Sequence, residues 1–143
     1  DHHAIHCDGN DYNLLVRPSL DGPSLTGVID FGDMVRAPHV CDLATAAAYM
    51  VLDKPRPMAA LQSLVAGYVA ACPLSAREID MVYPLMMVRL GVSLVNSAMM
   101  ARERPDDPYV TVSQAPAMAF LEVARHWSRD DVARRLRVAD HVH

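Results

Sequence analysis

The chain has 143 residues, a mass of 15.7 kDa and a formal charge of −4, from 13 basic and 17 acidic side chains. Hydrophobic residues make up 52% and charged residues 21%, a balance that predicts one compact globular domain and excludes a disordered segment. Because the charge is negative and the sequence has no long basic run, nucleic acid is not expected as a partner.

The first forty residues are predicted to form a small β platform. Residues 4–5 lead into a polar loop at 6–12, and a hairpin of two short strands follows at 14–16 and 25–29. The hairpin turn at residues 19–23 contains Asp-Gly, which supplies the backbone freedom that a tight turn needs.

From Pro38 onward the apolar residues recur at spacings of three and four, which indicates helices. We expect about five, over residues 38–51, 61–72, 75–99, 113–124 and from 128 onward, before a frayed tail at 139–143. The fold class is therefore α+β and mainly α, with chemistry where the hairpin meets the helices.

The long third helix has the clearest start signal. Ser75 with Glu78 forms a capping-box pattern, and Ser113 and Ser128 are expected caps of the last two helices. Pro84 is expected to kink or restart the long helix. Its apolar positions step by four and three along one face: Met81, Leu85, Val88, Val92, Val95 and Met99.

No membrane span and no membrane partner are expected, because the longest apolar stretch, residues 85–101, contains Arg89 and Asn96. The chain has three cysteines, which are Cys7, Cys41 and Cys72. Their odd number and wide spacing favour reduced thiols, and therefore a cytoplasmic protein, over a secreted disulfide framework.

Residues 6–13 have the form H-x-D-x-x-x-x-N, the spacing of the catalytic loop in protein kinases. Phosphoryl transfer needs a carboxylate that accepts the proton of the attacking hydroxyl, and beside it an amide oxygen that holds magnesium. Asp8 and Asn13 offer these two groups. A D-F-G element follows 17 positions after Asn13, where the second strand delivers Asp30 to a loop; in kinases this aspartate binds magnesium.

With these motifs in this order, the chain resembles the C-terminal lobe of the aminoglycoside phosphotransferase and choline kinase superfamily over nearly its whole length. Residues 6–13, 28–33 and 108–116 look most like the hydroxylysine kinase branch. The resemblance implies the C-terminal lobe of a protein-kinase-like fold. Residues 1–143 would then be a single partial domain, whose partner is an absent N-terminal nucleotide-binding lobe.

The resemblance also implies roles for particular residues. Asp8 would be the catalytic base, Asn13 and Asp30 would bind Mg²⁺ and the nucleotide phosphates, and His6 would order the loop.

Two further aspartates enter through the resemblance. Asp42 lies in a Cys-Asp-Leu-Ala segment similar to the family's acid-Leu-Ala segment, whose carboxylate braces the catalytic loop. Asp33 is a candidate for holding a cationic substrate.

The implied activity is Mg²⁺-dependent transfer of the γ-phosphate of ATP, or GTP, to the hydroxyl of a small amine or amino acid similar to hydroxylysine. Two departures from the family stand out. Many relatives have glycine where Cys7 stands, and nothing upstream of Asp1 supplies a phosphate-covering glycine loop or a strand lysine. This chain alone is therefore expected to be inactive.

Three other interpretations remain open. The chain can be a catalytically silent helical module that binds a small molecule, or a structural piece of a longer multidomain enzyme. A zinc cluster is also conceivable, although adjacent strand residues point to opposite faces. Its ligands would come from the first eight residues: His2, His3, His6, Cys7 and Asp8.

Overall fold

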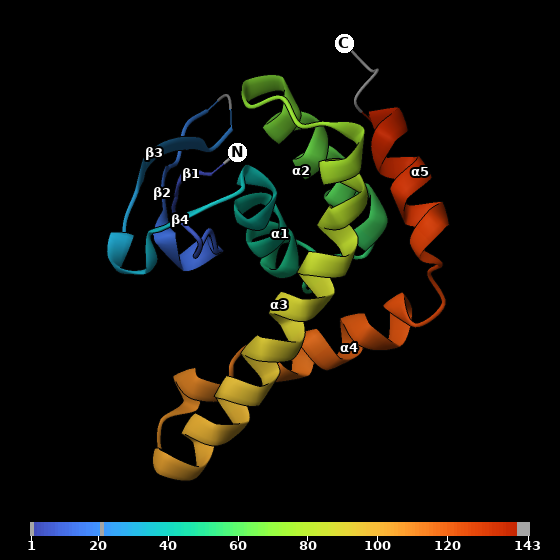
Figure 1. The fold of residues 1–143 in the computed structure, drawn as a ribbon. Coiled ribbons are helices and arrows are strands. Elements are labelled where there is room, and N and C mark those ends of the chain that lie inside the picture. The colour runs from blue at the N-terminus through green and yellow to red at the C-terminus, as the bar shows by residue number, and fades with distance from the viewer. Residues whose placement is uncertain (1, 21, 140–143) are drawn as a thin grey trace.

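The computed structural model describes residues 2–20 and 22–139, and it confirms the mainly helical α+β class. Figure 1 shows a small β region beside α1, with the other helices on the far side of α1 and along the long α3. The expected tail, residues 139–143, lies almost wholly outside the described residues, as does residue 21 of the hairpin turn.

The β region consists of two antiparallel pairs. β1 (His3–Ile5) pairs with β4 (Val35–Ala37), and β2 (Leu14–Arg17) pairs with β3 (Ser24–Val28). The β2–β3 hairpin agrees with the predicted one within one residue at each strand end. The β1–β4 pair was not predicted, because strands of three residues have no readable period. This pairing matters for the site because it brings together the two ends of residues 6–34, the segment that contains both kinase-like motifs.

Five α-helices follow in the described part of the chain, as expected. Their bounds are α1 His39–Met50, α2 Pro57–Ala71, α3 Ala76–Glu103, α4 Gln114–Ala124 and α5 Arg129–Ala139. Short 3-10 turns stand at η1 (Asp11–Asn13), η2 (Phe31–Asp33) and η3 (Pro108–Thr111).

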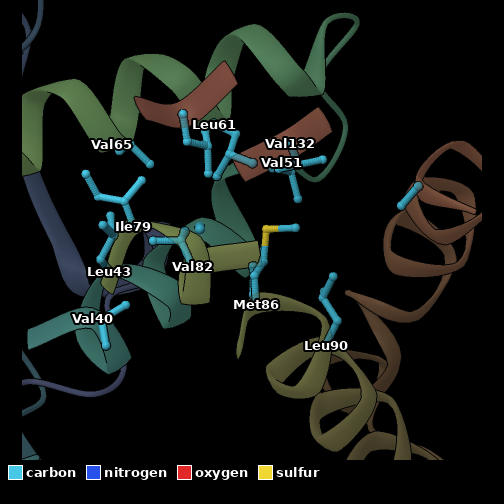
Figure 2. Close-up of a cluster of buried hydrophobic side chains, with 14 of the residues drawn as sticks. Val40, Leu43, Val51, Leu61, Val65, Ile79, Val82, Met86, Leu90 and Val132 are labelled. Atoms are coloured by element: carbon cyan, nitrogen blue, oxygen red, sulfur yellow. The ribbon is translucent and has the colours of Figure 1, made fainter. Parts of the chain in front are cut away.

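The hydrophobic core lies between α1, α2, α3 and α5 (Figure 2). Leu43 of α1, Leu61 of α2 and Leu136 of α5 have no exposed surface. At about 25 cal/mol per Å² of apolar surface removed from water, burying each of these side chains stabilises the fold by roughly 1.5–3 kcal/mol. The core therefore fixes α1 against α3, the two helices that border the predicted site.

The expected helix caps are present with one exception. Ser75 and Glu78 form the full capping box, and Ser128 Oγ accepts the backbone N–H of Asp131 at 3.1 Å. Ser113 occupies the cap position of α4, but its side chain makes no capping hydrogen bond.

The prediction for α3 was wrong in two respects. Pro84 does not restart the helix, which runs from Ala76 to Glu103, while a kink at Pro84 stays a prediction. The buried stripe of the helix is Ile79, Val82, Met86 and Leu90. Most of the face predicted from the sequence is exposed; Val88 and Val95, for example, are 62% and 59% exposed. The reason is that α3 is apolar on more than one side, so its period alone does not select the face that packs.

One helix among the described residues, α3, is long and apolar enough to cross a membrane by length and composition alone. A helix in a protein core can pass the same test, and the first half of α3 packs against α1 and α5. The C-terminal half extends away from these helices; η3 lies beside it, and α4 leads from there toward α5 (Figure 1).

Candidate active site

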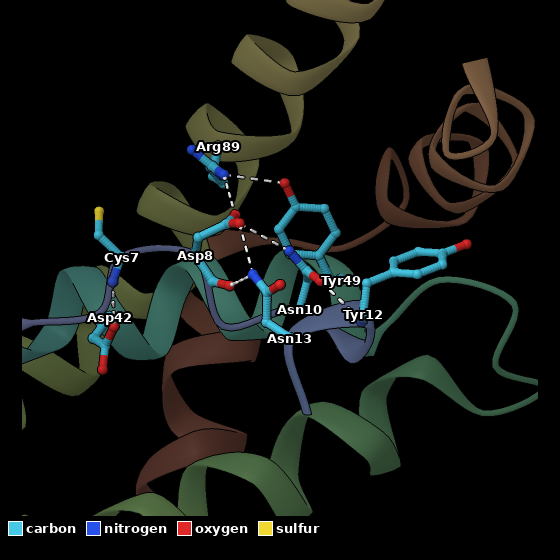
Figure 3. A network of polar contacts seen from close by, with 8 residues as sticks. All are labelled: Cys7, Asp8, Asn10, Tyr12, Asn13, Asp42, Tyr49 and Arg89. Atoms are coloured by element: carbon cyan, nitrogen blue, oxygen red, sulfur yellow. Dashed lines mark hydrogen bonds and ion pairs between the residues drawn. The ribbon is translucent and has the colours of Figure 1, made fainter. Parts of the chain in front are cut away.

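The carboxylate of Asp8 is held by three side chains (Figure 3). Asn10 and Asn13 donate their Nδ2 hydrogens to Oδ2, at 3.0 and 2.9 Å, and Arg89 of α3 donates Nη2–H to Oδ1 at 3.0 Å. Both oxygens of Asp8 therefore have a fixed direction. This is the preorganisation that a general base needs, because its position relative to the substrate hydroxyl sets its efficiency.

Asn13 is the buried member of the motif, with 7% of its surface exposed. Its Nδ2 also donates to the main-chain oxygen of Asp8 at 2.9 Å. Since the two amide hydrogens serve Asp8, the amide oxygen Oδ1 points away from it and remains as the group that can bind a cation. Oxygen is the ligand type that Mg²⁺ prefers.

Asp30 lies next to this asparagine because the hairpin folds back. The β2–β3 ladder ends with Leu14 opposite Val28, and the next residue, Ile29, donates its N–H to the main-chain oxygen of Asn13 at 3.0 Å. Asp30 follows directly, exposed, at the start of η2. Its φ of 62° is left-handed, a conformation that aspartate tolerates better than most residues.

His6 connects the two motifs. Its Nε2 donates to the main-chain oxygen of Ile29 at 2.9 Å, and its ring meets that of Phe31 edge-on, with 5.0 Å between centroids. Since a carbonyl oxygen only accepts, Nε2 carries the proton. His6 thus ties the loop before Asp8 to the residues on either side of Asp30, through Ile29 and Phe31. That it orders the loop for catalysis stays a prediction.

Asp42 contacts the catalytic loop from the first turn of α1. Its Oδ1 accepts the backbone N–H of Cys7 at 2.9 Å. Cys7 has a left-handed φ of 62°, which costs a residue other than glycine roughly 1–2 kcal/mol. A hydrogen bond to a charged group contributes about 1.5–3 kcal/mol and offsets this strain. Glycine would adopt the same conformation without this cost.

Asp33 is the one predicted residue that is not brought into this network. It lies exposed in η2. No hydrogen bond or ion pair joins it to the catalytic loop in the described part of the chain.

Sequence reasoning missed Arg89 and Tyr49. The guanidinium of Arg89 donates to the Tyr49 hydroxyl at 3.1 Å and lies 5.7 Å from the centre of its ring, while its ion pair with Asp8 is partly buried, with the two side chains 30% and 19% exposed. The signal was in the sequence. A cation inside a long apolar helix needs a partner, so the position of Arg89 alone predicts an acidic or polar neighbour.

The zinc alternative gains no support. Among residues 2–20 and 22–139, no three side chains of histidine, cysteine, aspartate or glutamate come together in a way that could hold a metal ion. That observation does not address a magnesium site of the kinase type, since such a site would use the oxygen of Asn13 together with Asp30 and would keep several waters.

This chain belongs to the phosphotransferase enzyme family, whose model matches residues 1–79, from the catalytic loop to the start of α3. It is similar to the hydroxylysine kinase of Danio rerio, with 34% identity over 134 residues, covering 91% of this chain and 37% of that protein. The hydroxylysine kinase of Mus musculus is 30% identical over 107 residues, 71% of this chain and 28% of that protein.

The hydroxylysine kinase of Xenopus laevis is 25% identical over 136 residues, 90% of this chain and 36% of that protein. The chain thus spans about a third of the length of these curated relatives. A comparison with solved structures gives no significant match.

Proposed function

We propose that this chain is the catalytic and acceptor-binding lobe of a cytoplasmic small-molecule kinase. In this proposal the γ-phosphate of ATP, or GTP, passes to the hydroxyl of a hydroxylated amine or amino acid, similar to hydroxylysine. The carrying observation is the Asp8–Asn13 pair, in which the amide hydrogens of Asn13 orient the base and leave the amide oxygen for a cation.

The donor set fits Mg²⁺. Asn13 contributes an amide oxygen and Asp30 an exposed carboxylate, and both residues lie at the open end of the hairpin. Hard oxygen ligands with room for water are what this ion requires. When bound, Mg²⁺ would neutralise phosphate charge. The nucleotide-binding lobe would come from the remainder of the full-length protein.

The residues of the chain then have distinct tasks. Asp8 accepts the proton of the acceptor hydroxyl at a carboxylate oxygen that is already aligned by Asn10, Asn13 and Arg89. Asp42 and His6 act through the loop: one holds Cys7 and the other holds Ile29. Most of the catalysis in phosphoryl transfer is positioning of this kind, combined with electrostatic stabilisation.

The test uses the full-length protein that contains this chain. Purified protein is incubated with Mg²⁺–ATP and, in turn, 5-hydroxylysine, ethanolamine and choline; ADP release and ³¹P NMR of the product are measured. The expected result is a phosphomonoester formed from at least one acceptor. Titration calorimetry of the same ligands separates the alternatives. If an acceptor binds but ATP does not, and no product forms, the chain is a silent binding module.

A further inference from the structure

Two cysteines line one open cavity of about 210 Å³ between the catalytic loop, α1 and α3. Cys7 belongs to the loop and Cys41 to the first turn of α1, and both are half-buried. The other lining residues are apolar, apart from Thr45 and Arg89. A small molecule that enters this cavity from solvent can therefore reach two thiols, and the proposed kinase reaction uses neither of them.

The main chains beside these thiols are held together. Asp42, the residue after Cys41, accepts the N–H of Cys7 at 2.9 Å, so the loop and the first turn of α1 are in contact at this place. A disulfide joins cysteines whose Cα atoms lie roughly 4.4–6.8 Å apart, and it needs backbone segments in contact of this kind. Cys72 is placed differently: its Sγ lies 2.9 Å from Nδ1 of His39, and it does not line the cavity.

The thiol of Cys41 is the weaker nucleophile of the pair. Burial raises its pKa, and the neighbouring thiol of Cys7 and the carboxylate of Asp42 raise the pKa further. The two thiols thus lie within electrostatic reach of each other. Because the thiolate is the form that attacks, Cys7 is expected to react first with an oxidant and Cys41 to react second.

We propose that Cys7 and Cys41 form a reversible disulfide across this cavity and that the bond inactivates the catalytic loop. Its effect on activity rests on the proposed kinase function. The oxidant is a low-mass disulfide such as oxidised glutathione. The thiolate of Cys7 attacks one sulfur of this reagent and releases a glutathione thiolate. Cys41 then gives its proton to solvent and attacks Sγ of Cys7, which forms the protein disulfide and releases the second glutathione thiolate. Two electrons thus pass from the two cysteines to the reagent, which leaves as two thiols after protonation.

The disulfide would act on the base through the residue next to it. Cys7 directly precedes Asp8, and Asp42 holds its backbone at a left-handed φ of 62°. A covalent bond from Cys7 to α1 displaces this part of the loop, whereas Asp8 needs the alignment that Asn13 and Arg89 give it. A misplacement of about 1 Å can lower turnover about 100-fold. In a reducing compartment such a bond is transient, which suits redox sensing.

The test equilibrates the full-length protein with glutathione buffers that become more oxidising, and then blocks the free thiols with iodoacetamide. Peptide mass spectrometry should find the Cys7 and Cys41 peptides joined, with the mass of two hydrogen atoms lost. In step with this, kcat for Mg²⁺–ATP and a phosphorylated acceptor should fall by about 10- to 100-fold. Dithiothreitol should reverse both changes.

Two matched variants separate this disulfide from other oxidation. Cys41→Ser should keep its turnover in the buffer that oxidises half of the unmodified protein, because a glutathione adduct of Cys7 lacks the favourable intramolecular second step. Cys72→Ser is the same change at a cysteine outside the cavity, and it should form the bond and lose turnover as the unmodified protein does.

Oxidation that gives no Cys7–Cys41 peptide overturns the proposal, and so does a Cys7–Cys41 bond that leaves kcat unchanged. Equal inactivation of Cys41→Ser contradicts it too, because a glutathione adduct would then be the cause. Thermal melting checks the fold of both variants, and if Cys41→Ser does not fold, the unmodified protein and Cys72→Ser decide. If no acceptor is phosphorylated, the proposed function fails by itself. Peptide mapping and amide hydrogen exchange of residues 6–13 then decide the disulfide: the bond should form and change the exchange of the loop, and absence of either result overturns it.

Discussion

Arg89 donates a hydrogen bond to Asp8 across 81 positions of sequence, and so forms a direct polar link between α3 and the catalytic loop. The other oxygen of Asp8 is held from within the loop, by Asn10 and Asn13. The orientation of the carboxylate thus depends on how α3 packs. Since Val82, Met86 and Leu90 fix α3 in the core, the site gains its geometry from the hydrophobic packing of the helices.

Replacement of Asp8 tests the assignment of the base. Asp8→Asn in the full-length protein keeps the shape of the side chain but removes its ability to accept a proton, so kcat should fall by about two to four orders of magnitude. ADP release under saturating Mg²⁺–ATP measures this. Asp11→Asn, at an exposed position of η1, is the matched control and should keep its turnover. Undiminished turnover in Asp8→Asn would exclude it as the base.

Replacement of Asp30 tests the predicted magnesium site. Asp30→Asn should raise the Mg²⁺ concentration needed for half-maximal activity by about tenfold or more, because a neutral amide binds this ion less tightly than a carboxylate. Folding should change little, since Asp30 is exposed. Asp33→Asn alters an exposed carboxylate in the same short turn and should leave the Mg²⁺ requirement as it is. An equal shift in both variants would contradict a specific role for Asp30.

Much of this site could be predicted from short segments of the sequence. The capping box of Ser75 and Glu78, the hairpin and the two kinase-like motifs are contained in short segments, where spacing and propensity decide the outcome. The hairpin then brings Asp30 beside Asn13 without help from the rest of the fold.

Contacts between distant segments were not predictable in the same way. The exposed face of α3 is as apolar as the buried one, so its pattern does not show that Met86 packs inward while Val88 faces outward. Which face of α3 is buried also decides whether Arg89 can reach Asp8. The Arg89–Asp8 pair can therefore be predicted only once the packing of α3 against α1 is known.

The contact between Asp42 and Cys7 predicts a graded effect of substitution. Asp42→Ala leaves the N–H of Cys7 without its partner while the left-handed backbone remains strained, and should reduce the free energy of unfolding by about 1–3 kcal/mol. Asp42→Asn keeps an acceptor oxygen, so a smaller loss is expected. Urea denaturation of the chain measures both. Equal losses in the two variants would mean that the negative charge, and not the hydrogen bond to Cys7, is what matters.

α5 offers a comparison between an ion pair and an apolar contact. Arg137 Nε donates to Asp80 Oδ1 at 2.7 Å, but both side chains are partly exposed, and such pairs contribute about 0–1 kcal/mol. Leu136 is completely buried, and Leu→Ala substitutions in a core cost about 2–5 kcal/mol. Leu136→Ala should therefore destabilise the chain several times more than Asp80→Asn in urea denaturation. The reverse order would show that α5 is held by charge.

The same ion pair predicts a dependence of stability on pH. Its hydrogen bond with Arg137 holds the pKa of Asp80 below the usual range for an aspartate, in spite of an opposing effect of burial. A carboxyl with a lower pKa in the folded state contributes stability at pH values above its unfolded pKa, about 4, and loses it as the pH falls through the folded pKa.

The free energies of unfolding of the unmodified chain and Asp80→Asn should therefore differ at pH 7, and the difference should shrink as the pH falls below the unfolded pKa of an aspartate, about 4. Glu78 and Asp131 also have lowered pKa values, through hydrogen bonds with Ser75 and Arg135, but both proteins share them, so they cancel in the difference. A difference that stays constant between pH 7 and pH 3 would mean that Asp80 contributes by its shape or polarity, because protonation of its carboxyl would then have changed nothing.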